Sequence, residues 1–208
     1  MSDETDKSDE EEQQQIRANL TWNLFNNGQY KTPEGEVLDP DSFHGKGEIL
    51  GVAYECWKEV CNANPVYNQS GCTIPWDSSS GHSDCSAYVS WVLYEYGIAS
   101  GNDALANEFR GGQHSSLTIQ TVDWNQLGFE TIEVAAGQNV IDILQPGDIL
   151  ARNSGGSGHV NIIVEVKDGK VYAYDCGSEN NWRNNPGNAV EKTYFASDSR
   201  PGMIIRKK

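Results

Sequence analysis

The segment 83–97 constrains the fold more than any other part of the sequence, because it predicts a helix with a cysteine in its first turn. Ser83 or Asp84 can act as the N-cap, since a short side-chain oxygen accepts hydrogen bonds from the free amides at a helix start. Apolar residues recur at helical spacing over 89–96, so one face of the helix is expected to pack inward. Gly97 is expected to end the helix in a left-handed conformation.

Cys85 lies at the start of this predicted helix, and that position has a chemical consequence. The partial positive charge of the helix N-terminus favours thiolate over thiol. A free thiol titrates near ~8.5, and a helix N-terminus or a neighbouring histidine can bring this pKa to roughly 3.5–7.5. The free amides around Cys85 could also hold an oxyanion. The alternative is a small buried hydrophobe, which is the common fate of a single cysteine.

The composition argues against two classes of partner. The chain has 208 residues, a length typical of one domain with a sizeable core. Its net charge is -15, from 30 acidic and 15 basic residues, and it has no basic stripe interleaved with aromatic residues. We therefore expect no nucleic-acid partner. No apolar run is long enough to span a bilayer, so membrane insertion is not expected either.

The first part of the chain differs in composition from the rest. Residues 1–15 are acidic and rich in glutamine, which predicts a disordered tail or linker. Residues 16–46 predict a short amphipathic helix and a loop extension rich in proline, glycine and aspartate. The sequence after Met1 lacks both the basic start and the apolar core of a signal peptide. The folded domain is therefore expected to comprise residues 47–208.

Within this domain, helices are expected first and strands afterwards. A helix over 46–62 carries an apolar stripe that we interpret as core packing, and Asn64-Pro65 ends it. Lys167-Asp168-Gly169-Lys170 predicts a hairpin turn. Apolar or alternating segments predict strands near 129–134, 149–151, 159–166, 171–174 and 202–206. The predicted class is α+β, with the helices packed on an antiparallel meander.

The chain contains five cysteines, an odd number: Cys56, Cys61, Cys72, Cys85 and Cys176. Four paired cysteines and one reactive thiol would suit an exported enzyme. Cys61–Cys72 is the more plausible pair, because Cys56 and Cys61 point in different directions on their helix. No CxxC pair and no His/Cys cluster has the spacing of a zinc site. We therefore expect no metal and no cofactor.

A nucleophilic cysteine needs a base, and the base needs a group that orients it. Among the four histidines, His159 opens a buried strand after a glycine-rich loop, where its side chain could reach a cleft from a rigid backbone. His82 lies shortly before Cys85 and is the rival by proximity in sequence. His114 lies in a loop and could line a cleft. Any one of these histidines is more often structural than catalytic.

The predicted hairpin favours His159. Its turn near 168–169 brings Asp175 close to His159 on the adjacent strand. A carboxylate at this place would hold the imidazole in one tautomer. The alternative is an ordinary charge at a strand end. Cys176 points to the other face of the strand and is interpreted as structural.

Three short motifs follow one another along the chain: Asp84-Cys85-Ser86, Pro146-Gly147-Asp148-Ile149-Leu150 and Gly158-His159-Val160. In this order and spacing they resemble the motifs of papain-like bacterial cell-wall hydrolases, the NlpC-type endopeptidases and the related CHAP domains. The resemblance covers roughly residue 47 to the C-terminus. It implies a papain-like fold in which the helix that carries the cysteine packs on a central antiparallel sheet.

The same resemblance implies roles for individual residues. Cys85 would be the nucleophile and His159 the base. The segment 169–175 resembles the strand that carries the third polar residue of these families, which is often His, Asn, Gln or Glu. Asp175 would take that place and departs from the usual residue types. The further residues that we assign to substrate or oxyanion binding are Tyr67, Asp84, Ser86, Gln113 and Trp182.

The implied function is a cysteine hydrolase that cleaves amide bonds in the stem or cross-bridge peptides of peptidoglycan. One alternative is an amidase that cuts the sugar–peptide bond on the same fold, and another is a catalytically weak wall-binding or assembly module. Transfer of the acyl group to an amine on a protein substrate is a further alternative. We expect an extracellular monomer at the cell wall, targeted there by a further wall-binding or upstream module, because the acidic chain has little attraction for an anionic wall.

Overall fold

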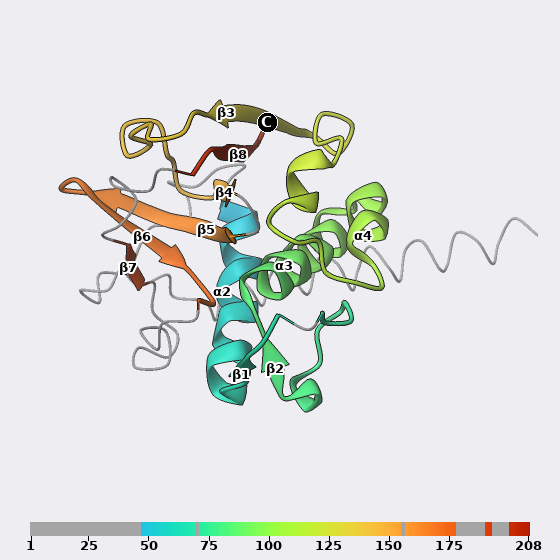
Figure 1. Cartoon of the computed structure of the whole chain (residues 1–208). Helices are drawn as coiled ribbons and strands as arrows, with labels where there is room; N and C mark the ends of the chain where they lie inside the picture. The colour runs from blue at the N-terminus through green and yellow to red at the C-terminus, as the bar shows by residue number, and fades with distance from the viewer. Residues whose placement is uncertain (1–46, 70, 155–156, 178–189, 193–199) are drawn as a thin grey trace, which may run out of the picture.

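The computed structural model describes residues 47–69, 71–154, 157–177, 190–192 and 200–208 (Figure 1). The tail 1–15, the extension 16–46 and Trp182 therefore lie outside the described residues. The helices are α2 (Gly47–Ala63), α3 (Cys85–Ser100) and α4 (Asp103–Phe109), with 3-10 turns η2 (Ser78–Ser80) and η3 (Thr118–Thr121). The strands are β1 (Val66–Tyr67), β2 (His82–Ser83), β3 (Phe129–Val134), β4 (Ile149–Ser154), β5 (Ser157–Lys167), β6 (Lys170–Tyr174), β7 (Val190–Lys192) and β8 (Gly202–Lys207). The α+β class expected from the sequence is confirmed.

The main sheet has six strands in the order β3-β8-β4-β5-β6-β7, and every neighbouring pair is antiparallel. Strands β4 to β6 form the expected meander, and β7, which the sequence did not predict, continues it. Strand β8 is an exception, because it lies between β3 and β4 instead of at an edge of the sheet. The prediction of a simple meander was therefore wrong at the last strand. A separate pair, β1 and β2, runs parallel and was not expected.

Both faces of the main sheet are covered by apolar residues. On one face, α2 and α3 pack beside each other and against β5 (Figure 1). The expected stripe of α2 is buried there: Ile49, Val52, Ala53, Cys56, Trp57 and Val60. The other face carries a smaller cluster formed by Val134, Val140, Leu144, Leu150, Ile163, Val171, Ala173 and Ile204. Strand β5 contributes to both clusters, as expected for a central strand.

The hairpin between β5 and β6 forms as predicted. Asp168 and Gly169 both have positive φ angles, 52° and 74°, which a tight two-residue hairpin turn requires. A register shift between Ile163 and Glu165 marks a bulge in β5. Because the hairpin is tight, residues at the start of β5 lie beside the chain that leaves β6.

Helix α3 continues beyond the expected end. Gly97 lies inside the helix, and Gly101 takes the left-handed conformation at the C-cap, with φ 71°. A Cβ atom on Gly97 would lie 2.5 Å from the backbone nitrogen of Ala106 in α4. Gly97 therefore permits close contact between two helices instead of ending one. Helix α4 itself was not predicted, because its seven residues are too few to show a helical period.

The expected pair Cys61–Cys72 is not formed, and all five cysteines are free and buried. The Cys72 thiol instead lies 3.7 Å from the carbonyl oxygen of His82, within its own loop. Cys61 belongs to the core on the inner side of α2. The prediction failed because spacing along a chain does not fix the direction in which two thiols point. Among the helices that are described, none is both long and apolar enough to cross a membrane.

Candidate active site

The N-terminus of α3 is capped by Asp84. Its Oδ1 atom accepts hydrogen bonds from the backbone amides of Ser86 and Ala87, both at 2.8 Å, and from the Ser86 hydroxyl at 2.7 Å. Asp84 is buried, with an exposed fraction of 1%. Of the two N-cap candidates in the sequence, Asp84 is therefore the one used. The cap fixes where α3 begins and so where Cys85 stands.

Gln113 reinforces this cap from a distant loop. Its side-chain amide nitrogen donates to Asp84 Oδ2 at 3.0 Å and to Ser86 Oγ at 2.9 Å. Its side-chain oxygen accepts from the backbone amide of Cys72 at 2.7 Å. The structure thus brings Asp84, Ser86 and Gln113 together as expected, but as an internal network. Gln113 turns its amide inward, whereas the sequence analysis assigned it to substrate or oxyanion binding.

His159 and Asp175 meet at the start of β5 and just beyond β6. His159 Nε2 lies 2.6 Å from Asp175 Oδ1, and their side chains are 15% and 1% exposed. At this distance the imidazolium and the carboxylate form a largely buried, hydrogen-bonded ion pair. The expected approach of these two residues is confirmed. Since Nε2 faces Asp175, Nδ1 is the nitrogen left for the thiol of Cys85.

The charges around His159 determine its protonation. Burial alone lowers the pKa of this imidazole, but the Asp175 carboxylate and a hydrogen bond with Cys85 outweigh burial and raise the pKa to about 10. At neutral pH the imidazole therefore carries a proton. Cys85, only 4% exposed, is the hydrogen-bonding partner on the side away from Asp175. The charged imidazole therefore lies between the Asp175 carboxylate and the sulfur of Cys85.

Tyr67 reaches the same place through the β1–β2 pair. The backbone of Tyr67 pairs with that of Ser83, two residues before Cys85. The long segment between Tyr67 and Ser83 therefore begins and ends at neighbouring positions. Burial, and next the charges of Cys85 and Asp84, raise the pKa of the Tyr67 hydroxyl, which keeps it protonated. This hydroxyl also accepts a hydrogen bond of 3.2 Å from Gln69.

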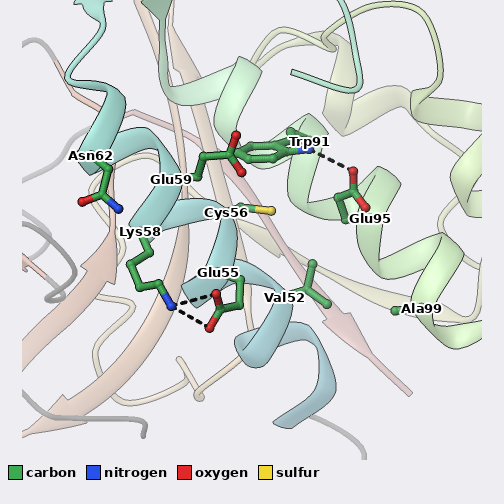
Figure 2. Close-up of a pocket in the computed structure, with 9 residues that line it drawn as sticks. All are labelled: Val52, Glu55, Cys56, Lys58, Glu59, Asn62, Trp91, Glu95 and Ala99. Atoms are coloured by element: carbon green, nitrogen blue, oxygen red, sulfur yellow. Dashed lines mark hydrogen bonds and ion pairs between the residues drawn. The ribbon is translucent and has the colours of Figure 1, made fainter. Parts of the chain in front are cut away.

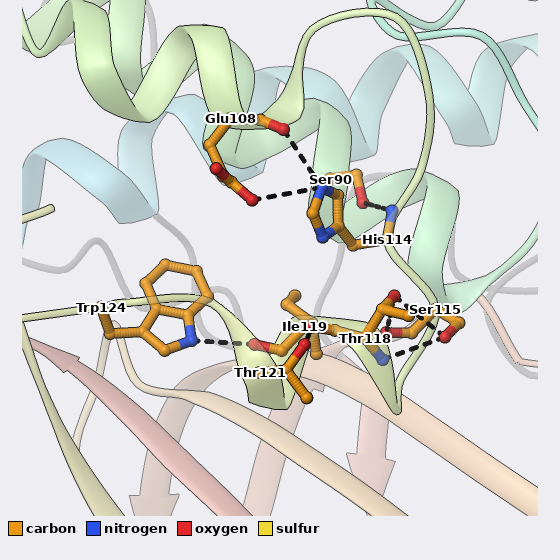
Figure 3. Close-up of polar contacts among 8 residues, drawn as sticks. All are labelled: Ser90, Glu108, His114, Ser115, Thr118, Ile119, Thr121 and Trp124. Carbon is orange, nitrogen blue, oxygen red and sulfur yellow. Dashed lines mark hydrogen bonds and ion pairs between the residues drawn. The ribbon is translucent and has the colours of Figure 1, made fainter.

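The loop after α4 is fixed in place beside the start of β5 (Figure 3). The His114 amide donates to the hydroxyl of the buried Ser90 at 2.9 Å, and Trp124 Nε1 donates to the carbonyl of Ile119 at 2.8 Å. Further along this loop, Ser116 contacts Gly158, the residue before His159. A Cβ atom on Gly158 would lie 1.7 Å from Ser116 Oγ. Gly158 is therefore the residue type that this contact requires.

The other two histidines that are described take part in local structure. His82 Nδ1 contacts the carbonyl oxygen of Ser80 at 2.8 Å. His114 Nε2 contacts the backbone carbonyl of Glu108 at 3.1 Å (Figure 3). Its ring also packs on Phe109, with centroids 4.7 Å apart. Both rings are held by their own loops. His159 is the histidine that the structure brings to Cys85.

Two residues near the site were not singled out from the sequence as neighbours of Cys85. Ser83 is fully buried beside the helix start, and Cys176 is fully buried directly after Asp175. Burial raises the pKa of the Cys176 thiol, whereas its hydrogen bond with the Ser83 hydroxyl lowers it. Cys176 belongs to the core cluster that the sheet shares with the helices, whereas the sequence predicted only that it points to the other face of the strand from Asp175.

Asp148, from the motif at 146–150, has a structural role. Its carboxylate pairs with the Arg206 guanidinium through contacts of 2.8 Å and 2.7 Å and accepts the Gln145 amide at 2.7 Å. The pair ties the turn before β4 to β8, and Asp148 is fully buried. In the described ranges, no group of three or more His, Cys, Asp or Glu residues could hold a metal ion.

The comparisons with known proteins agree with this geometry. Residues 73–177 match the CHAP domain, and this segment is slightly more than half of the chain. It includes Cys85, His159 and Asp175. No curated protein and no solved structure matches the chain significantly. The extent of the match places the chain in the CHAP-domain family, whose members are typically hydrolases that act on peptidoglycan.

Proposed function

We propose that the chain is a cysteine hydrolase that cleaves amide bonds in the peptide part of peptidoglycan. The observation that carries the proposal is the row formed by three side chains. Cys85 stands at the capped start of α3, His159 contacts it, and Asp175 lies 2.6 Å beyond the far nitrogen of His159. A nucleophile, a base and an orienting carboxylate in contact are the requirements for covalent acyl transfer.

The first half of the reaction forms a thioester. The thiolate of Cys85 attacks the amide carbonyl carbon, a C–S bond forms, and the carbonyl π electrons move to oxygen. As the tetrahedral intermediate collapses, the C–N bond breaks and the His159 imidazolium gives its proton to the leaving amine. Neutral His159 then accepts a proton from water, which attacks the thioester. The acid leaves, and the Cys85 thiolate and the imidazolium are restored.

The oxyanion would be stabilised at the start of α3. Asp84 occupies the amides of Ser86 and Ala87, so the amide of Cys85 is the donor that remains in the first turn. The Tyr67 hydroxyl on β1 would be the second donor, because its raised pKa keeps it protonated. In this proposal Asp84, Ser86 and Gln113 position the helix start and do not bind substrate. Trp182 stays a candidate for substrate binding.

The site of action follows from the substrate class. We propose that the chain works outside the cell at the wall, as a monomer, and that a further module supplies wall affinity. The support is its net charge of -15, which gives it little attraction to an anionic polymer. Sedimentation of the chain with purified wall sacculi at physiological salt would contradict the need for such a module.

The test is digestion of purified peptidoglycan, with mass analysis of the released fragments. Wild type should create new carboxyl and amino termini, and Cys85→Ala should create none. Cys61→Ala is the matched control, because it removes another buried thiol that lies in the α2 core. We expect the control to retain wild-type activity. Circular dichroism would establish that all three proteins are folded.

The fragments also identify the bond. New amino termini inside the stem peptide or on cross-bridge residues support the peptidase. A free amino terminus on the first stem residue, with a free lactyl carboxylate left on the sugar, identifies the sugar–peptide amidase. Release by Cys85→Ala at the wild-type rate would refute the role of Cys85. No release by any folded variant would favour a wall-binding module.

A further inference from the structure

A cavity lies between α2 and α3, lined by side chains of both helices (Figure 2). The cavity has a volume of about 420 Å³, within the range of roughly 300–1,000 Å³ in which small-molecule sites fall. It lies away from Cys85: Trp91, on its wall, is six residues further along α3, about 9 Å along the helix axis. The proposed hydrolysis makes no use of it.

The lining of this cavity is divided by chemistry. Its floor is apolar and buried, formed by Val52, Cys56 and Trp91, with exposed fractions of 4%, 4% and 6%. Its rim carries carboxylates from both helices, Glu55 and Glu59 from α2 and Glu95 from α3. A ligand that fits must therefore present apolar surface inward and a group that suits carboxylates at the rim.

Among the described residues, the charge at the rim is only partly neutralised. Lys58 pairs with Glu55 at 2.8 Å, so one carboxylate already holds an ammonium group. Over the residues that the structure describes, no lysine, arginine or histidine forms an ion pair with Glu59 or Glu95. Glu95 accepts a hydrogen bond of 3.0 Å from Trp91 Nε1, which holds its carboxylate at the edge of the indole.

The carboxylates at the rim raise the pKa of neighbouring groups in the cavity. Burial raises the pKa of Glu95, and the charge of Glu59 raises it further. Burial also raises the pKa of the Cys56 thiol, and the charges of Glu95, Glu59 and Glu55 add to this effect. The negative potential of the rim therefore extends into the cavity. A cation between Glu59 and Glu95 would relieve this repulsion.

The kind of cation follows from the spacing. The described carboxylates are not grouped closely enough to coordinate a metal ion. An indole face with carboxylates at its edges suits an ammonium group, through charge and cation–π attraction, and its attached methylenes. Figure 2 shows Glu59 and Glu95 flanking Trp91 above Cys56. Lys58, which pairs with Glu55 and lies 5.2 Å from the Tyr54 ring centre, is an example of this chemistry at the same rim.

We propose that this cavity binds an alkylammonium group, with the ammonium between Glu59 and Glu95 and its methylene chain on Trp91 and Cys56. Such a group is carried by free diamines and by lysine-type side chains. The proposal stands apart from the hydrolysis proposed above, because its readout is binding. It therefore holds or fails whatever Cys85 does.

The test is calorimetric titration of the full chain with three probes of similar length: 1,5-diaminopentane, Nα-acetyl-lysine amide and the neutral 1,5-pentanediol. We expect the diamine to bind, the diol not to bind, and the affinity of the diamine to fall as salt is raised. Binding of the lysine amide identifies a side chain as the natural occupant. If the diamine binds and the lysine amide does not, the natural occupant is a free diamine.

The variant Glu59→Gln/Glu95→Gln removes both charges without removing volume, and we expect the affinity for the diamine to fall by about fivefold or more. The matched control is Glu130→Gln/Glu133→Gln on β3. It removes the same number of negative charges as the cavity variant, but at a place far from the cavity. An equal loss in the control would reduce the effect to bulk charge and overturn the proposal. No binding of the diamine to folded wild type, or undiminished binding to the cavity variant, would overturn it as well.

Discussion

The side chain of His159 shows how a contact between two residues decides a protonation state. Its imidazole is buried, which alone would favour the neutral form, yet Asp175 and Cys85 raise its pKa to about 10. Its usual pKa is ~6.5. The proton is therefore present throughout the neutral range, and the imidazolium is the resting form of this side chain.

This protonation predicts the pH dependence of activity. The alkaline limb of kcat/KM should lie near pH 10, where the imidazolium loses its proton. In Asp175→Asn the limb should move down by about 1–3 pH units, because the charge that raises the pKa is gone. The measurement is kcat/KM on a soluble peptide fragment of peptidoglycan between pH 5 and 11, buffered at constant salt. Asp123→Asn, at an exposed site, should leave the limb in place.

The same group links stability to pH. The folded-state pKa of His159 lies above the unfolded value, so its contribution is complete below about pH 6.5 and is lost as pH rises towards 10. Urea unfolding of wild type should show this loss over that interval, and the loss should be smaller in Asp175→Asn. Identical pH profiles of activity and of stability for both proteins would contradict the assigned role of Asp175.

Single residues were predictable where a local pattern constrained them. Cys85 was identified because it begins a helix, and Asp175 because a tight hairpin sets which residues face His159. The inward direction of Gln113 was not predictable, because its partners, Asp84 and Cys72, lie 29 and 41 residues away. A loop residue carries no local sign of such a contact.

Among the elements, the N-terminus of α3 depends most on one side chain, the buried N-cap Asp84. Asp84→Ala should destabilise the fold by about 2–4 kcal/mol, from the lost cap and from the partners of Asp84 left unsatisfied in the interior. It should also lower kcat/KM, because Cys85 loses its fixed position. Asn102→Ala is the matched control: Asn102 caps α4 through the Leu105 amide, and its loss should cost about 1–2 kcal/mol.

Urea unfolding and hydrolysis assays on both variants separate the two effects. For Asn102→Ala, activity per folded molecule should stay at the wild-type level. If Asp84→Ala lost stability but kept full activity, the cap would not position the nucleophile. If both variants lost activity equally, the effect would be one of general stability.

The elements also show where sequence patterns fail. The ends of α2, the hairpin and β3 followed from periodicity and turn residues. The end of α3 did not, because Gly97 serves a contact with α4 that no local pattern reveals. The parallel β1–β2 pair has two residues in each strand. Such short strands are held by their surroundings and leave almost no pattern of their own.

For the whole molecule, the least predictable feature is the place of β8. Its apolar sequence identified β8 as a strand. When both faces of a sheet are covered, however, an edge strand and an interior strand have the same pattern of apolar residues. Pairing with β3 and β4 and the buried Asp148–Arg206 ion pair hold it inside the sheet. This arrangement depends on contacts 58 residues apart in sequence.

Removal of residues 202–208 should therefore abolish cooperative thermal unfolding. The truncation takes away two strand ladders and leaves the fully buried Asp148 without its guanidinium, a loss of about 3–5 kcal/mol for the ion pair alone. Circular dichroism between 20 and 90 °C is the measurement. Removal of Lys208 alone should preserve the transition, because it costs one backbone bond to Gly128. A cooperative transition in the longer truncation would contradict this account.

The interior position of β8 also has a consequence for the time at which the chain can fold. During synthesis, β3 and β4 emerge from the ribosome long before β8, and until residue 207 has been made the place between them is empty. The β4–β5 pairing that presents His159 then lacks its neighbour on one side. We therefore expect the sheet to close around β4, and the pairing that presents His159 to gain its second neighbour, only after β8 has emerged.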